Sequence, residues 1–179
     1  MNQSKVSTRY AKAIFELAKE KGKLHEVQKS LHIIQEAIKS VPEIDTLLNS
    51  PIITQLKKNE TLALAFGNYA DELTLQFISL LVQNRREAQL PGIIRVFQDH
   101  YLQHEHIKPV TITTAGALAE STREQIVHMV ENAYKSKAEI KHIQDPGIIG
   151  GLILRIDHVQ VNLSVANQLN KIKNKIVNI

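Results

Sequence analysis

Residues 4–21 read SKVSTRYAKAIFELAKEK and are followed by Gly22. The stretch is rich in strong helix formers, and glycine commonly follows the last helical residue, so these residues predict a helix. Its polar side chains fall on one stripe: Arg9, Lys12, Glu16, Lys19 and Glu20. Apolar side chains cover nearly all the rest, a broader arc than a surface helix hides. Either the helix is set deeply in a bundle, or one flank meets the core and the other meets a partner helix.

A second helix with the same character is predicted over residues 71–84, DELTLQFISLLVQN. Its polar stripe consists of Glu72, Gln76, Ser79 and Gln83. Leucine, isoleucine, valine and phenylalanine surround that stripe, so this helix also has more apolar surface than a single core contact requires.

The rest of the first hundred residues is helical as well. Amphipathic spacing and boundary residues predict helices over residues 23–41, 42–50, 54–69 and 91–105. With the two broad-faced helices they make six, joined by short connections. We therefore expect a six-helix N-terminal bundle over residues 1–105.

The pattern changes after residue 106. Strands are predicted over 110–114 and 138–144, a helix over 119–137, and a hairpin from 151–156 and 159–163. A final helix starts near Ser164, and its apolar stripe is Val165, Leu169, Ile172 and Ile176. That stripe is either core or a partner contact. The fold class is mainly α, with a smaller α+β domain over 106–179 that holds a short sheet and a C-terminal helix.

Composition excludes several kinds of site. The 179 residues include no cysteine and no tryptophan, and aromatic residues are 4%. This rules out disulfides and thiolate metal sites, and it is poor material for an aromatic-lined pocket. The net charge of +4 permits anionic partners without indicating them. No run approaches 18 apolar residues and the N-terminus lacks an apolar signal core, so the residues themselves favour the cytoplasm.

Candidate chemistry is sparse. His100 and His104 have a spacing that suits two metal ligands, beside Glu105 and His106. The order HExxH is missing and the cluster lies where a helix should end in a linker, so a solvated helix end is the favoured explanation. Gly150 and Gly151 precede a strand rather than open a helix, so they indicate a structural turn or bulge, not a phosphate loop. No nucleophile motif, carboxylate pair or clustered basic face stands out. We therefore predict no catalytic, cofactor or metal site, and an interaction protein.

Several stretches resemble, in order, the family of ATP synthase delta subunits and the mitochondrial oligomycin-sensitivity-conferring protein. They are RYAKAIFELA at 9–18, LLVQNRREAQLPGIIRVF at 80–97, VTITTAGAL at 110–118, DPGIIGGLILRI at 145–156 and VQVNLSVANQLNKIKNKI at 159–176. Each is mainly a pattern of apolar and small residues. Their order and spacing over nearly the whole chain carry the resemblance, while Asn162 and Leu163 depart from the usual Asp and Gly.

The resemblance implies a non-catalytic stator subunit at the cytoplasmic face of the bacterial cell membrane, peripheral and not inserted. The N-terminal bundle would bind N-terminal helices of the alpha subunits, in a groove between the first and fifth helices. Our candidates for that groove are Tyr10, Ala13, Leu17, Phe77, Ile78 and Leu81. The C-terminal domain would bind the b subunits of the peripheral stalk through Val165, Leu169, Ile172 and Ile176. The alternatives are a free-standing helical adaptor or a weakly basic nucleic-acid binder; we expect no nucleic acid and no cofactor.

Overall fold

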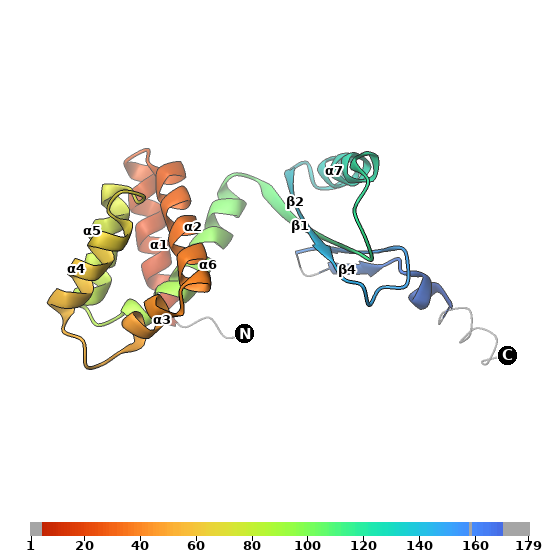
Figure 1. Ribbon diagram of the computed structural model, residues 1–179. Helices are drawn as coiled ribbons and strands as arrows, with labels where there is room; N and C mark the ends of the chain where they lie inside the picture. Colours follow the sequence, from red (N-terminus) through yellow and green to blue (C-terminus); the bar gives the residue numbers. More distant parts are fainter. Residues whose placement is uncertain (1–4, 158, 170–179) are drawn as a thin grey trace. The chain divides into compact units, whose positions relative to one another are not determined.

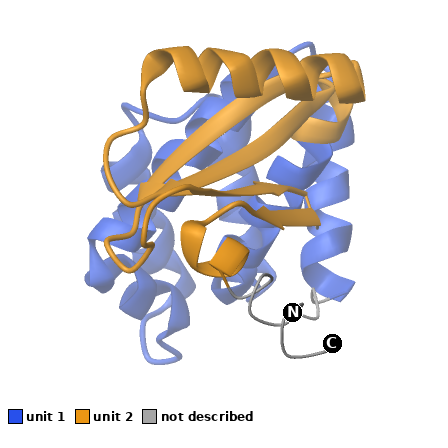
Figure 2. Cartoon of the chain, turned by 90° about the vertical axis from the view of Figure 1, so that its right-hand side faces the viewer, with its two compact units in different colours: residues 1–101 blue, residues 102–179 orange. Residues whose placement is uncertain are grey.

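The chain divides into two compact units, Met1–Tyr101 and Leu102–Ile179, coloured separately in Figure 2. This computed structural model describes residues 5–157 and 159–169. Each unit contains a hydrophobic cluster of its own. The division falls a few residues before the one drawn from the sequence.

The N-terminal unit is built from helices packed side by side (Figure 1). They are α1 (Lys5–Glu20), α2 (Leu24–Ser40), α3 (Pro42–Asn49), α4 (Gln55–Phe66), α5 (Glu72–Gln83), the one-turn 3-10 helix η1 (Glu87–Gln89) and α6 (Leu90–His104). The predicted count of six is therefore not confirmed. The additional segment, η1, is too short to show a helical repeat in the sequence.

Turn chemistry sets the helix boundaries. Gly22 ends α1 in the left-handed region, with φ of +66°, where glycine has no steric cost. Thr54 and Asp71 accept hydrogen bonds at the starts of α4 and α5, satisfying backbone donors that the helix leaves free. Ala11 and Ala18 are fully buried on α1, and such small side chains allow neighbouring helices to approach closely.

A buried ion pair ties α4 to the α5–α6 connection. The Lys58 ammonium lies 2.5 Å from Glu87 Oε1 and also donates to the Leu48 carbonyl at 3.2 Å. The two charged residues are only 3% and 8% exposed. Glu87 Oε2 has no hydrogen-bond partner among the described residues. Because two buried charges compensate each other here, removing either one alone leaves an unpaired charge in the core.

The described part of the C-terminal unit contains a four-stranded sheet and the 15-residue helix α7. Its elements are β1 (Ile107–Thr114), α7 (Glu120–Tyr134), β2 (Lys137–Gln144), β3 (Leu152–Ile156) and β4 (Val159–Asn162), in the sheet order β2-β1-β3-β4. β1 and β2 are parallel and joined by α7, while the other pairs are antiparallel. The predicted hairpin of β3 and β4 is confirmed. Its turn uses Asp157 at φ of +51°, a conformation that Asp tolerates better than most residues.

α7 covers one face of the sheet (Figure 2). Register places Val110 of β1 beside Ile140 and Ile156 on that face, and Ile126 and Val130 of α7 pack against it. The expected fold class, mainly α with a small sheet, is confirmed. Residues 165–169 are helical, as expected of the C-terminal helix.

Gly150 and Gly151 both have positive φ, at +66° and +78°. A Cβ on Gly151 would lie 2.5 Å from the Leu163 carbonyl oxygen and 2.9 Å from Ser164 Cα. A Cβ on Gly150 would lie 3.3 Å from Val165 Cγ2. The positive φ angles and the close neighbours explain why glycine occupies both positions. The steric constraint is strongest at Gly151, where the atoms that a Cβ would approach belong to the backbone.

We expect Gly151→Ala to destabilise the C-terminal unit by about 2 kcal/mol or more, because an L-residue in the left-handed region costs roughly 1–2 kcal/mol before any clash. Gly116→Ala is the matched control, since a Cβ there meets nothing within 4 Å and φ is not positive. Thermal unfolding and amide exchange of β3 measure the difference. Equal stability of the two variants would contradict the expectation.

Candidate functional site

An apolar groove of about 370 Å³ runs between α1 and α5. The residues that line it are Tyr10, Ala13, Ile14, Leu17, Leu73, Gln76, Phe77 and Leu80. Four come from each helix, and the four follow the same spacing on both, i, i+3, i+4 and i+7. This spacing places side chains on one helical face, so each helix turns a continuous stripe toward the groove.

The two walls run antiparallel. Tyr10, in the first half of α1, meets Phe77 of α5 edge to face, with ring centroids 6.5 Å apart. Lys23, which follows the end of α1, meets Asp71 at the start of α5. The groove therefore has an aromatic contact near one end and an ion pair beyond the other.

The surface of the groove suits an apolar partner. Leu17 is 38% exposed and Leu80 is 46% exposed, although both are large aliphatic side chains. Ala13 is exposed between them, and its small side chain leaves room for close approach of a backbone. Gln76 is the polar member of the lining, and its amide donates to Glu72 at 3.1 Å. Exposed apolar anchors at helical spacing are what a docked amphipathic helix requires.

The structure brings four of the six proposed groove residues together: Tyr10, Ala13, Leu17 and Phe77. Ile78 and Leu81 do not line the groove; they are 3% and 0% exposed and belong to the helical core. At about 100° per residue, Ile78 lies about 150° and Leu81 about 90° from the middle of the stripe that α5 turns toward the groove, so both side chains fall outside that stripe.

Sequence reasoning missed Ile14, Leu73, Gln76 and Leu80 as groove residues. The signal that could have found them is the shared spacing: positions 73, 76, 77 and 80 on α5 repeat the pattern of positions 10, 13, 14 and 17 on α1.

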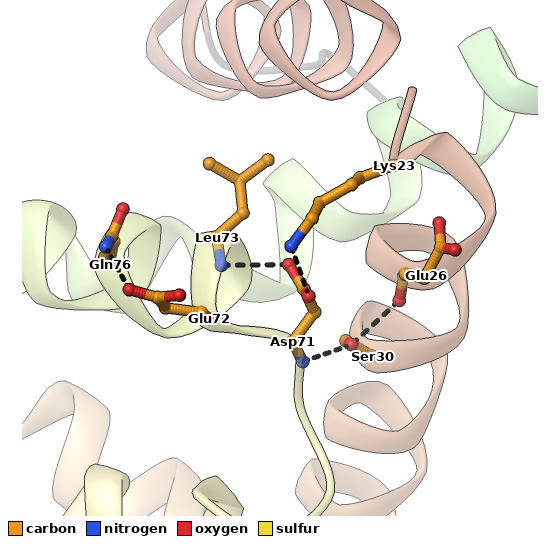
Figure 3. Close-up of polar contacts among 7 residues, drawn as sticks. All are labelled: Lys23, Glu26, Ser30, Asp71, Glu72, Leu73 and Gln76. Carbon is orange, nitrogen blue, oxygen red and sulfur yellow. Dashed lines mark hydrogen bonds and ion pairs between the residues drawn. The ribbon is translucent and has the colours of Figure 1, made fainter. Parts of the chain in front are cut away.

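A polar network fixes the start of α5 beside the groove (Figure 3). The backbone N–H of Asp71 donates to Ser30 Oγ at 2.8 Å, and that hydroxyl donates to the Glu26 carbonyl of α2. The Asp71 carboxylate accepts from the Leu73 N–H at 2.9 Å and from Lys23 at 3.1 Å. Because Leu73 lines the groove, this network positions one of its walls.

The two charged groups of the network shift each other's ionisation. Partial burial acts to raise the pKa of the Asp71 carboxyl, but the Leu73 N–H and the Lys23 ammonium outweigh it and hold the pKa below 3.8. The hydrogen bond to Asp71 and the charge of its carboxylate raise the pKa of Lys23 above 10.5. Both groups are thus charged across the neutral range.

The pair predicts a pH dependence of stability. A lowered carboxyl pKa stabilises the fold above pH 3.8, and that contribution is lost as the pH falls through the folded-state pKa of Asp71. A raised lysine pKa stabilises below pH 10.5 and is lost as the pH rises further. The free-energy difference between wild type and Asp71→Asn, measured by urea unfolding, should be flat from about pH 5 to 9 and shrink below pH 3.8. A difference that persists unchanged at pH 2 would contradict it.

The histidines at the end of α6 do not converge. The His100 ring lies against Phe15, with centroids 5.7 Å apart, whereas His104 contacts the neighbouring Glu105 at 3.1 Å. Within residues 5–157 and 159–169, no group of three or more His, Asp or Glu side chains could hold a metal ion. Over the same residues, none of the helices has the length and apolar character to cross a membrane.

The proposed stalk residues are only partly described. Val165 is 42% exposed and Leu169 is 60% exposed. Ile172 and Ile176 lie outside the described residues. Leu163, 47% exposed, and Ile149, 73% exposed, are further large apolar side chains on the surface of this unit.

The chain is similar to proteins of one family. Residues 6–176 match the family model described as ATP synthase delta (OSCP) subunit. "ATP synthase subunit delta" of Cytophaga hutchinsonii is 34% identical, over 98% of this chain and 96% of the relative. The protein of that name from Carboxydothermus hydrogenoformans is 30% identical, over 98% and 99%. A chain in the Toxoplasma gondii mitochondrial ATP synthase hexamer shares the fold, with a TM-score of 0.76 and 23% identity over 97% and 98% of the two chains.

Proposed function

Because the chain belongs to the ATP synthase delta (OSCP) subunit family, we propose that it is the non-catalytic stator subunit that joins the catalytic head of the synthase to its peripheral stalk. In this role the N-terminal unit, residues 1–105 by the boundary predicted from the sequence, binds the head. The C-terminal unit, residues 106–179, binds the stalk.

The groove between α1 and α5 carries this proposal. A joint between subunits needs a surface that stays open in the isolated protein and matches a partner element, and this groove is apolar, partly exposed and patterned at helical spacing on both walls. We propose that its occupant is the N-terminal helix of an alpha subunit. Tyr10, Ala13, Leu17 and Phe77 would contact that helix directly.

The C-terminal unit offers the second contact. Val165 and Leu169 are exposed on the helical residues that follow Ser164. In the proposal they meet the C-terminal end of a stalk b subunit. Burying such aliphatic side chains would contribute about 1.5–3 kcal/mol each if burial were complete.

Mechanically, the protein resists torque rather than performing chemistry. The head must stay still while the central rotor turns, because a head that rotated with the rotor would make no ATP. A protein that binds head and stalk through separate units supplies that restraint. The proposal places it at the cytoplasmic face of the bacterial membrane, held there by the complex.

Amide hydrogen exchange of the full chain tests both assignments. A peptide of the first residues of the alpha subunit should slow exchange in α1 and α5 and leave α7 unchanged. A peptide of the C-terminal end of the b subunit should slow exchange around residues 163–169 and leave α1 unchanged. Protection by the alpha peptide outside α1 and α5 would contradict the groove as its site.

A further inference from the structure

Charged side chains are distributed unevenly along the outer edge of α1. An α-helix turns by about 100° per residue. Measured around the axis of α1, Glu20 therefore lies about 20° and Arg9 about 40° from Ala13, on the side away from the core, and Glu16 lies next to them. All three are exposed. Glu16 and Glu20 lie toward the end of α1, whereas Arg9 lies toward its start, about 16 Å from Glu20 along the axis.

The start of α5 adds to the acidic end of the groove. The Glu72 carboxylate accepts from the side chain of Gln76, which lines the groove (Figure 3). Lys23 lies at this end too, but Asp71 pairs with it. Lys19 lies about 120° around α1 from Ala13, on the side opposite the groove lining, and Lys21 follows the helix. Even with Lys19, Lys21 and Lys23 all counted, this end has three ammonium groups against four carboxylates, those of Glu16, Glu20, Asp71 and Glu72.

The other end of the groove is basic. Arg9 stands over the Tyr10 ring, 5.7 Å from its centroid, and Lys5 starts α1. The antiparallel arrangement brings the end of α5, followed by Arg85 and Arg86, to the same end. The next acidic residue, Glu87, is buried against Lys58. The groove therefore runs from an acidic end to a basic end, with apolar walls between them.

We infer that the groove selects its partner helix by charge as well as by apolar fit: the helix lies with a cationic segment between Glu16, Glu20 and Glu72 and an anionic segment beside Arg9. The inference rests on the proposed function, in which the occupant is the N-terminal helix of an alpha subunit. The apolar stripes supply the area buried, but the repeated spacing on the two walls is nearly indifferent to direction. The charges at the two ends give the bound helix one direction.

Charge reversal tests the inference through affinity. Binding of the alpha N-terminal peptide to the full chain is measured for wild type, for Glu16→Lys with Glu20→Lys, and for Glu60→Lys, an exposed control on α4. We expect the double variant to bind roughly fivefold more weakly at low salt, and the loss to shrink at 1 M salt, where the screening length falls to about 3 Å. Affinity equal to that of the control would overturn the inference.

A spin label then locates the two segments. The chain has no cysteine, so Lys19→Cys and Thr8→Cys each give one thiol, at opposite ends of α1. The label at position 19 should broaden the signals of lysine and arginine residues of the isotope-labelled peptide, and the label at position 8 those of its acidic residues. The reverse pattern would overturn the inference that charge sets the direction of the bound helix, but the groove would still be its binding site. Absence of any binding by wild type would overturn the proposed function, and with it the inference about charge, which rests on that function.

Discussion

Ala13→Arg is expected to weaken binding of the alpha N-terminal peptide by roughly a hundredfold, about 2.7 kcal/mol, while leaving the fold unchanged. Ala13 lies exposed in the middle of the groove wall on α1. An arginine there fills the space that the partner backbone would occupy, and docking would bury its charge without a partner. The stability of the free protein should change little, because the arginine side chain reaches solvent and arginine is a good helix former.

The matched control is Ala65→Arg, the same change at an exposed position on α4 outside the groove lining. Both variants should unfold at the wild-type urea midpoint, and only Ala13→Arg should lose the peptide. Phe77 is a poorer position for this test because it is only 7% exposed, so an aspartate there would damage the core. If Ala13→Arg bound as tightly as Ala65→Arg, the partner would not lie along this face of α1.

Lys58→Met is expected to lower the free energy of unfolding of the N-terminal unit by about 3–5 kcal/mol. The change removes the ammonium group that compensates the charge of Glu87 and donates a hydrogen bond to the Leu48 carbonyl. Among the residues that the structure describes, Glu87 Oε2 has no hydrogen-bond partner even in the wild type. Deprived of Lys58, the whole carboxylate would be buried unpaired, which is the main cost of breaking such a pair.

The double variant Lys58→Met, Glu87→Leu separates this cost from the loss of packing. With both charges gone, stability should return to within about 1 kcal/mol of wild type or exceed it. Urea unfolding followed by circular dichroism measures all three proteins. A double variant no more stable than Lys58→Met would show that the pair does more than neutralise its own charges.

The helices that form the groove could be predicted because their apolar arcs are broad. What the sequence could not decide is which part of each arc faces outward. α5 is apolar almost all round, so its period does not distinguish Leu73 from Ile78. The neighbours of α5 decide it: Leu73 and Ile78 are both buried in the helical core, but only Leu73 also borders the groove beside α1.

Two other features could not be predicted from local sequence patterns. η1 is a single turn and has no period to detect. The Lys58–Glu87 pair joins residues 29 positions apart, and nothing in their spacing indicates contact. The hairpin of β3 and β4, in contrast, was predictable because alternation on both sides of a short turn is a local signal.

Calorimetric titration of the full wild-type chain with a synthetic peptide of the alpha subunit N-terminus measures directly whether the groove between α1 and α5 binds that helix. We expect saturable binding of one peptide per chain, with a negative change in heat capacity from burial of the apolar groove. Absence of binding under conditions where the chain is folded would contradict it.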